Sequence, residues 1–314
     1  MKKNTEKLSR TCCPVDLRCE HLVDPMGIDE INPRLSWRMD DSRKGARQTA
    51  YRITAATSLE KLESRPDLWD SKKVKCDDSL DIPWGGKKLK SRQRVFWRVR
   101  LWDHKGAASE WSGRAFFEMG LLEKADWKAM WIGRPMESKE GSQPCPFLRR
   151  AFSVEKNVAR ARVYVTARGL FELYINGQRI GLDYFTPGWT DYWKRIQYHA
   201  YDVTEQIRLG ANALGAILGD GWYAGYLMWR YQRFIYGDQL SLLLQLEIDY
   251  TDGSREIVAG GPEWKTSFGP ILNSDIYNGE TYDARREIPG WSGSSFDGSG
   301  WAPAAVYEAP KSAL

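Results

Sequence analysis

The chain has 314 residues, which is long enough for about two domains of ~150 residues each. Hydrophobic residues make up 42% of the chain and charged residues 28%, a balance that is typical of globular domains. The formal net charge of +5 comes from 46 basic and 41 acidic residues, and because no long basic run occurs, the charge pattern argues against nucleic-acid binding.

The N-terminal segment starts with basic residues, but no apolar stretch follows it as it would in a signal peptide. No window of the sequence approaches 18 consecutive apolar residues, so we predict no transmembrane helix. These features favour a cytoplasmic protein without a membrane partner. We expect residues 1–13 to form a flexible tail.

Alternation of apolar and polar residues predicts β-strands throughout the first half of the chain. It is found at residues 35–39, 51–55 and 94–103. In the last of these ranges one face is apolar, and it carries Val95, Trp97, Val99 and Leu101. Between these strands, residues 58–62 are a candidate for a short helix.

The second half of the chain shows the same alternation. Residues 171–175 predict a strand, and Asn176-Gly177 after it is a strong signal for a tight hairpin turn. Residues 240–250 predict the clearest strand, with leucines on one face and Ser241, Gln245, Glu247 and Asp249 on the other. Asp252-Gly253 predicts the turn to a return strand at 255–258, and residues 203–209 are a second candidate for a short helix.

Many short strands with turn signals and few helices predict an all-β protein built from sandwiches. We expect a first domain at residues 14–122 and a second at residues 146–308. The polar run at 137–144 predicts a linker between them, which we place at residues 123–145. Residues 309–314 are expected to begin a connection to a further domain.

The sequence contains no common catalytic or metal-binding motif. The cysteines show no disulfide or zinc spacing; they are Cys12, Cys13, Cys19, Cys76 and Cys145. The three histidines lie outside zinc-protease or catalytic-triad patterns, and the sequence has no GxSxG motif and no phosphate-binding loop. None of these patterns supplies a catalytic residue.

Longer motifs resemble one enzyme family. Residues 68–71, 91–99 and 116–122 resemble the opening domain of bacterial α-L-rhamnosidases of glycoside hydrolase family 78, a fibronectin III-like or immunoglobulin-like sandwich. The second domain resembles the N-terminal jelly roll of the same enzymes, a galactose-binding-like sandwich similar to carbohydrate-binding modules. Five ordered motifs carry this second resemblance, at residues 166–177, 186–192, 218–225, 236–238 and 274–285.

The resemblance implies that the chain is the N-terminal accessory portion of an inverting α-L-rhamnosidase, which hydrolyses terminal α-L-rhamnosides. In that family a C-terminal (α/α)₆ barrel carries catalysis, so we expect the chain to be inactive alone and the barrel to be its partner. Rhamnose-containing glycosides are the expected ligands. Two alternatives stay open: a stand-alone lectin-like carbohydrate-binding protein, and a purely structural β-sandwich.

Four residues of the second domain are candidates for binding sugar. Trp189, Trp222 and Tyr223 can supply an aromatic platform, and Asp220, within a Gly-Asp-Gly turn motif, can supply polar contacts. The alternative is structural, with the aromatic residues in the core or an interface and Asp220 capping its own turn.

The resemblance also implies calcium, because some family members bind L-rhamnose through this ion; we predict no other cofactor. Calcium prefers six to eight oxygen ligands. The candidates are Asp238, Asp275, Asn278 and Glu280, which stand in glycine-containing turns. As an alternative, residues 280–285 form an ion-paired seam against the missing domain.

Overall fold

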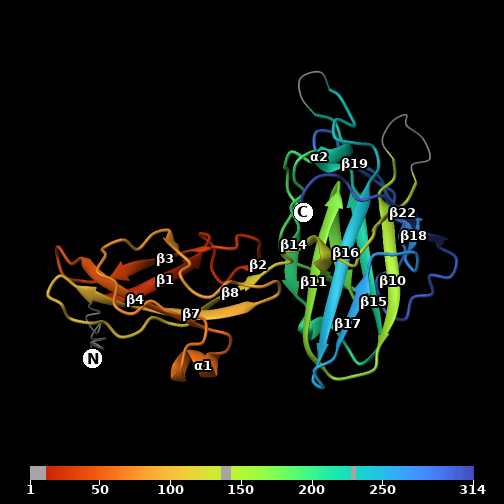
Figure 1. Cartoon of the computed structure of the whole chain (residues 1–314). Helices are drawn as coiled ribbons and strands as arrows, with labels where there is room; N and C mark the ends of the chain where they lie inside the picture. The colour runs from red at the N-terminus through yellow and green to blue at the C-terminus, as the bar shows by residue number, and fades with distance from the viewer. Residues whose placement is uncertain (1–11, 136–142, 228–230) are drawn as a thin grey trace, which may run out of the picture. The chain divides into compact units, whose positions relative to one another are not determined.

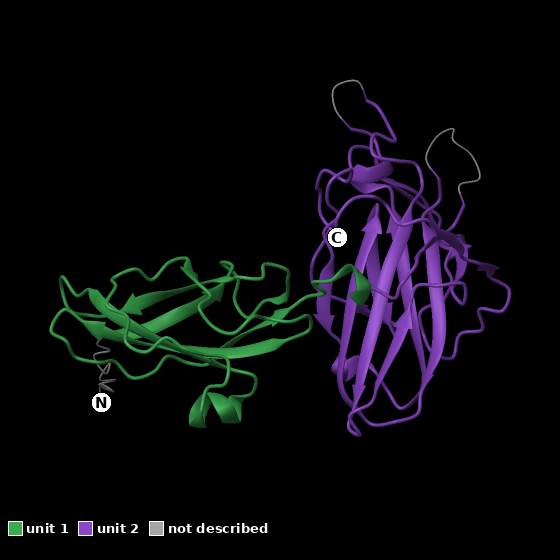
Figure 2. Cartoon of the chain, in the orientation of Figure 1, with its two compact units in different colours: residues 1–126 green, residues 127–314 purple. Residues whose placement is uncertain are grey.

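The computed structural model describes residues 12–135, 143–227 and 231–314. Two compact units, Met1–Asp126 and Trp127–Leu314, divide the chain (Figure 2). Each unit is built from β-strands, as Figure 1 shows, which confirms the all-β prediction. No helix in these described ranges is long and apolar enough to cross a membrane.

Unit 1 is an immunoglobulin-like β-sandwich. Its two sheets have the strand orders β1-β3-β6 and β2-β8-β7-β4-β5. The elements of unit 1, in chain order, are β1 (Cys13–Cys19), β2 (Met26–Ile28), β3 (Arg34–Asp40), β4 (Gln48–Ala56), α1 (Leu59–Ser64), β5 (Trp69–Asp70), β6 (Ile82–Pro83), β7 (Arg94–Asp103), β8 (Ala115–Met119) and the 3₁₀ helix η1 (Lys124–Asp126).

The core of unit 1 lies between these sheets and follows the predicted alternation. Four side chains of β7 are fully buried, as expected; they are Val95, Trp97, Val99 and Leu101. The predicted short helix is α1, and Ser58 caps it by accepting a hydrogen bond from the Lys61 N–H. Leu62 anchors α1 to the unit because its side chain is fully buried.

Unit 2 is a larger β-sandwich. One sheet has the order β13-β12-β15-β10-β18-β21, and the other has the order β14-β11-β16-β9-β22, with β17 also paired to β16. The elements of unit 2 are β9 (Trp131–Gly133), β10 (Pro146–Val154), β11 (Val158–Arg168), β12 (Leu170–Ile175), β13 (Gln178–Ile180), β14 (His199–Asp202), η2 (Thr204–Gln206), β15 (Gly210–Gly219), α2 (Gly221–Ala224), β16 (Ser241–Tyr250), β17 (Arg255–Ala259), β18 (Lys265–Phe268), β19 (Ile271–Asp275), β20 (Gly279–Tyr282), η3 (Ala284–Arg286), β21 (Ala302–Pro303) and β22 (Ala305–Tyr307).

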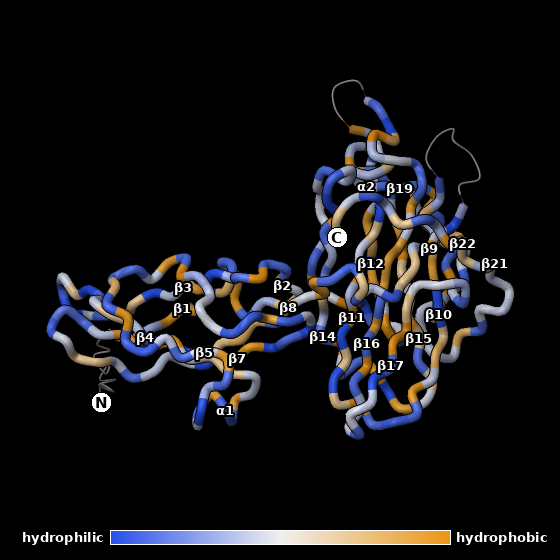
Figure 3. Tube along the Cα trace, in the orientation of Figure 1, coloured by the Kyte–Doolittle hydropathy of each residue, from blue (hydrophilic) through white to orange (hydrophobic). Residues whose placement is uncertain are grey.

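Both predicted hairpins of unit 2 are present. Asn176 and Gly177 join β12 to β13 with φ angles of 51° and 85°, the left-handed conformation that a tight hairpin turn requires. Gly253, at φ 83°, lies in the turn from β16 to β17. The hydropathy of the chain, drawn in Figure 3, shows hydrophobic residues along the strands of unit 2. Residues 203–209 form only the 3₁₀ helix η2 rather than a longer helix.

Most of the polar face of β16 is buried, like its leucine face; Asp249 near the end of the strand is half-buried. Gln245 is fully buried there, and its Oε1 accepts a 2.6 Å hydrogen bond from the Lys128 N–H. A segment just before β9 therefore covers this face. β9 itself pairs with β16 and with β22. The interval 123–145, expected to be a linker, thus contributes a strand and a covering segment to unit 2.

Both expected terminal segments also take part in the structure. Residues 1–11 of the expected tail lie outside the described residues, but Cys12 is buried and its N–H donates to Asp41 at 2.8 Å. At the other end, the Ala313 N–H donates to the Lys194 carbonyl, and Leu314 packs against the core of unit 2. Most of the polar run at 137–144 lies outside the described residues.

Candidate functional site

The loop between β13 and β14, residues 181–198, contributes aromatic side chains that pack against residues of and after α2. Figure 1 shows α2 and β19 at the same end of unit 2. Asp191 stabilises its turn, because its carbonyl accepts from the Lys194 and Arg195 N–H groups. Tyr192 anchors the loop, since its ring is buried and its hydroxyl donates to the Gly188 carbonyl at 3.0 Å. The turn and the anchor fix where the neighbouring tryptophans lie.

Trp189 and Trp222, two of the predicted sugar-binding residues, are brought together. Their rings are nearly parallel, with an interplanar angle of 7° and centroids 6.0 Å apart. Trp189 is 54% exposed, and its Nε1–H donates to the Tyr236 hydroxyl at 3.3 Å. Trp193, 64% exposed, also packs against Tyr236, with ring centroids 4.8 Å apart. We call these four residues the aromatic platform. Trp189 and Trp193 are exposed, whereas Trp222 and Tyr236 are half-buried and pack against the core.

Tyr223 belongs to the core rather than to this platform. Its side chain is only 7% exposed, and its ring packs against Tyr192 with centroids 5.4 Å apart. Gly237 lies so close that a Cβ there would stand 2.2 Å from the Tyr223 hydroxyl. Burial raises the pKa of Tyr223, an effect that the nearby Arg168 charge partly offsets. The structural alternative fits this residue.

Asp220 forms a buried ion pair. Its Oδ2 accepts a 2.6 Å hydrogen bond from Nη2 of Arg233, and the two side chains are 4% and 7% exposed. The Arg233 guanidinium also lies 4.5 Å from the centroid of the Phe234 ring and 5.2 Å from that of Tyr226. Asp220 makes no side-chain cap to α2. Its carboxylate is therefore engaged in holding the segment after α2 and is poorly placed to contact a sugar.

The four calcium candidates do not share one site, because their side chains have different neighbours. Asp238 lines a narrow cleft together with Asp220 and Arg134. Asp275 accepts three backbone N–H groups, from Tyr226, Tyr277 and Asn278, at 2.8–2.9 Å. It therefore ties the β19–β20 turn to the segment after α2.

Asn278 and Glu280 complete the set of calcium candidates. Asn278 accepts a hydrogen bond from the Tyr231 hydroxyl, and Glu280 lines a different, open cleft. Within the described ranges, no group of three His, Cys, Asp or Glu donor atoms close enough for a metal includes any of these residues. The arrangement of these four side chains does not fit the predicted calcium cage.

The open cleft lies on the outer face of the sheet that contains β12 and β15, and its volume is about 250 Å³. Its walls come from β12, β15, the β19–β20 hairpin and the loop at Tyr184 and Phe185. Cys145 lies beside it, and burial, with the charges of Asp220 and Glu280, raises the pKa of this thiol well above its usual value. The cleft thus combines apolar, aromatic and acidic side chains.

Comparison with known families decides what kind of chain this is. Residues 156–314 match the family model described as the Alpha-L-rhamnosidase N-terminal domain. Residues 14–123 match the model of the Rha78A-like, N-terminal immunoglobulin domain. The chain belongs to the N-terminal region of family 78 α-L-rhamnosidases. The resemblance seen in the sequence motifs is therefore confirmed.

Several α-L-rhamnosidases are similar to this N-terminal region. The enzyme of Alteromonas sp. (strain LOR) is 43% identical over 291 residues, which cover 90% of this chain and 32% of that enzyme. An enzyme of Formosa agariphila is 41% identical over 296 residues, covering 92% of this chain and 32% of its own length. The chain thus spans about a third of the length of these curated relatives.

Solved structures of α-L-rhamnosidases share the fold. The structure from Dictyoglumus thermophilum has a TM-score of 0.87 and 39% identity, covering 98% of this chain and 35% of that one. The Streptomyces avermitilis enzyme, solved in complex with L-rhamnose, has a TM-score of 0.90 and 29% identity, and the match covers 95% of this chain and 45% of that one. Its sequence alignment runs over 449 residues, more than the 314 of this chain, so that enzyme contains an inserted segment with no counterpart here.

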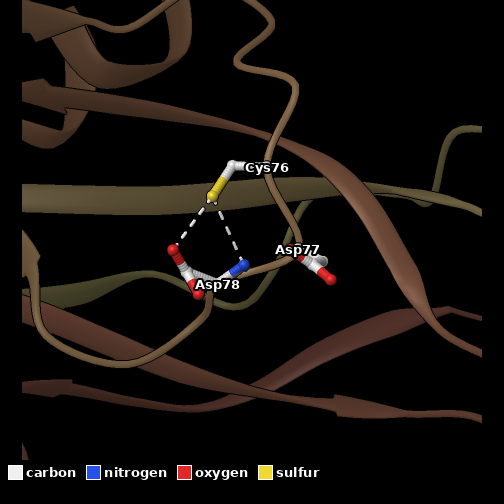
Figure 4. Close-up of side chains that lie close together, drawn as sticks. All are labelled: Cys76, Asp77 and Asp78. Carbon is white, nitrogen blue, oxygen red and sulfur yellow. Dashed lines mark hydrogen bonds between the residues drawn. The ribbon is translucent and has the colours of Figure 1, made fainter.

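One donor group that the sequence motifs did not predict lies in the immunoglobulin-like domain of this rhamnosidase region. Figure 4 shows Cys76, Asp77 and Asp78, whose ligand atoms lie within 4.8 Å of one another. The Asp78 N–H donates a hydrogen bond to the sulfur and by itself lowers the pKa of the Cys76 thiol. The net effect is a raised pKa, because the thiol donates a hydrogen bond to the Asp78 carboxylate, is partly buried and lies near acidic charge. A protonated thiol is a poor metal ligand, so the group is better explained as a hydrogen-bonded turn.

The residues that sequence reasoning missed in the rhamnosidase jelly roll are Arg233, Phe185, Gly219 and Glu172. Arg233 lies between the motifs at 218–225 and 236–238, so nothing in the sequence linked it to Asp220. Phe185 stands in an irregular loop, and Gly219 ends a strand. A signal did exist for Glu172, because it alternates with the buried Phe171 and Leu173 and so had to lie on the outer face of β12.

Proposed function

We propose that this chain is the N-terminal accessory portion of an α-L-rhamnosidase, in which it supports the catalytic domain and contributes a surface that binds rhamnosides. The observation that carries the proposal is the ordered match of both units to the N-terminal third of such enzymes. Hydrolysis of terminal α-L-rhamnosides is then the activity of the whole protein. The chain by itself is expected to be inactive.

The supporting role rests on the surface around the loop at 181–198. Trp189 is 54% exposed and Trp193 64% exposed, and both contact Tyr236; large exposed apolar side chains that lie close together commonly mark an interaction surface. Ala313 is hydrogen-bonded to Lys194 and Ile196, directly beside Trp193 in the chain. We infer that Trp193 contacts the part of a full-length α-L-rhamnosidase that lies outside the region matched by this chain.

This contact can be tested by comparing one substitution in two contexts. Trp193→Ala is expected to leave the thermal midpoint of this chain nearly unchanged, because the ring is mostly in solvent. In the full-length natural protein, the same substitution should lower the midpoint, because a buried aromatic contact is lost. Equal effects in both contexts would contradict a docking role for Trp193.

The sugar-binding role rests on the parallel Trp189–Trp222 pair. Aromatic ring faces pack against the apolar faces of sugar rings, and a polar group nearby orients the ligand. Trp189→Phe should retain most of the binding of L-rhamnose measured by calorimetry, whereas Trp189→Ala should weaken it. An unchanged affinity in Trp189→Ala would remove this residue from the binding surface.

A further inference from the structure

We propose that the open cleft on the outer face of the β12–β15 sheet is a binding site for a single 6-deoxyhexose ring, with L-rhamnose as the preferred ligand. The inference rests on the proposed function and specifies where, and through which groups, the accessory portion holds sugar. The cleft is contiguous with the aromatic platform, because the ring of Phe185 lies 5.9 Å from that of Trp222.

The floor of the cleft comes from two cross-strand pairs. Leu170 of β12 pairs with Gly219 of β15, and Glu172 pairs with Ile217. Their neighbours Phe171 and Leu218 point into the core of unit 2, so these four residues face outward. The missing side chain at Gly219 leaves room in the floor: a Cβ there would meet nothing closer than the Ser274 Oγ, at 3.7 Å.

The polar side of the cleft is held in position before any ligand arrives. Glu172 accepts a 2.8 Å hydrogen bond from the Tyr174 hydroxyl, and its other oxygen lies 3.5 Å from Nε of Arg179. A carboxylate has about four acceptor sites, so capacity remains for sugar hydroxyls. Ser274 and Glu280, which face each other across the β19–β20 hairpin, line the cleft as well.

An aromatic lip stands at the mouth of the cleft. Tyr184 is 77% exposed and Phe185 is 60% exposed. Phe185 has a φ of 58°, the left-handed region that a bulky side chain rarely adopts. Thr186 holds this conformation, since it exchanges hydrogen bonds with the backbone of Phe171 at 2.9 and 2.6 Å. The backbone thus keeps an aromatic ring in solvent beside a cleft, against its conformational preference.

The dimensions and lining of the cleft select the ligand class. Its volume of about 250 Å³ is below the ~300–1,000 Å³ of pockets for drug-sized ligands, which matches one sugar ring. Leu170, Ile217 and Ile271 offer an apolar surface for a methyl group, while the carboxylates accept hydrogen bonds from ring hydroxyls. L-Rhamnose has this division. L-Mannose differs from it only by a hydroxyl at C6, which would lose its water against the apolar floor.

Calorimetric titration of this chain with L-rhamnose and L-mannose tests the site. We expect L-rhamnose to bind about 10-fold more tightly than L-mannose, a discrimination that an apolar surface can supply against an added hydroxyl. Gly219→Val fills the floor and should weaken L-rhamnose binding at least 10-fold. The matched control is Gly300→Val, at an exposed glycine where a Cβ would meet nothing within 4 Å, and it should bind like the wild type.

Two further variants keep the test decisive. If the circular dichroism spectrum shows that Gly219→Val is unfolded, Phe185→Ala is tested in its place. The Phe185 ring is exposed, so its removal leaves the core intact. A similar loss of affinity for L-rhamnose is expected. Glu172→Gln should weaken binding while keeping the shape of the cleft. Wild-type affinity in Phe185→Ala and Glu172→Gln, or no heat with L-rhamnose, would overturn the proposed cleft site. The proposed function fails separately, if the full-length natural protein does not hydrolyse α-L-rhamnosides.

Discussion

Replacing Asp220 by Asn leaves the Arg233 guanidinium without its charged partner in a buried position. The two side chains are 4% and 7% exposed, and the Oδ2–Nη2 distance is 2.6 Å. Asn has nearly the shape of Asp, so the substitution removes the charge with little change in packing. The effect therefore reports on the ion pair itself.

The expected cost follows from this burial. Breaking a buried ion pair by removing one partner destabilises a protein by about 3–5 kcal/mol, because the remaining charge stays desolvated. For a domain of 150–250 residues, each kcal/mol shifts the thermal midpoint by about 2–4 °C. We therefore expect the midpoint of unit 2 in Asp220→Asn to fall by roughly 6–20 °C.

Urea unfolding followed by tryptophan fluorescence measures this loss of stability. Two control variants show whether it comes from the buried charge. Asp220→Leu combined with Arg233→Met removes both charges and should recover most of the stability, because an apolar pair carries no unpaired charge. Lys156→Met breaks an ion pair whose side chains are 50% and 52% exposed, and should cost at most about 1 kcal/mol.

One result would refute the structural reading of Asp220. If the free energy of unfolding of Asp220→Asn were within about 1 kcal/mol of the wild-type value but its affinity for L-rhamnose were lost, the carboxylate would be a sugar ligand, as the sequence analysis predicted. A loss of stability together with unchanged affinity supports the ion pair.

Three other predictions concern separate parts of the chain. The Arg52 hydrogen bonds keep the pKa of Asp70 below its unfolded value of ~3.9, so this carboxylate stabilises unit 1 above about pH 4 and loses its effect as the pH falls through the lower folded-state pKa. Asp70→Asn should therefore be less stable than the wild type at pH 6, and the difference should shrink towards pH 2 in urea titrations; a constant difference would contradict the assignment. Gln245→Leu removes the side chain that accepts from the Lys128 N–H and donates to Glu247, and it should destabilise unit 2 by about 1–3 kcal/mol in the same assay; an unchanged stability would show that this contact does not hold the segment before β9 on unit 2. Trp189→Ala removes a half-exposed ring and should change stability by about 0.5 kcal/mol or less, so a large loss of stability would show that the ring is structural.

The strands of both units were accessible from sequence because one face of each had to be apolar. The Asn176-Gly177 turn was accessible as well, because few residue pairs adopt two successive left-handed conformations. The segment 123–145 was harder to interpret. Its role depends on Gln245, a residue more than a hundred positions later that accepts a hydrogen bond from Lys128, and no local pattern signals such a partner.

The candidate site divides in a similar way. Trp189 and Trp222 were predicted as a platform and do lie together. Asp220 and Asp275 were named for their acidic side chains, but their partners, Arg233 and three backbone N–H groups, come from tertiary structure. Residue type alone could not separate a ligand carboxylate from one that is already engaged. For Glu172, the alternation of β12 predicted its position on the outer face of the sheet, but no sequence pattern predicted the cleft beside it.

The most direct test of the central claim is an assay of α-L-rhamnoside hydrolysis on two proteins, this chain and the full-length natural protein that contains it. With an aryl α-L-rhamnoside as substrate, we predict turnover by the full-length protein and none by the chain alone at equal molar concentration. Turnover by the chain alone, or its absence in the full-length protein, would contradict the account.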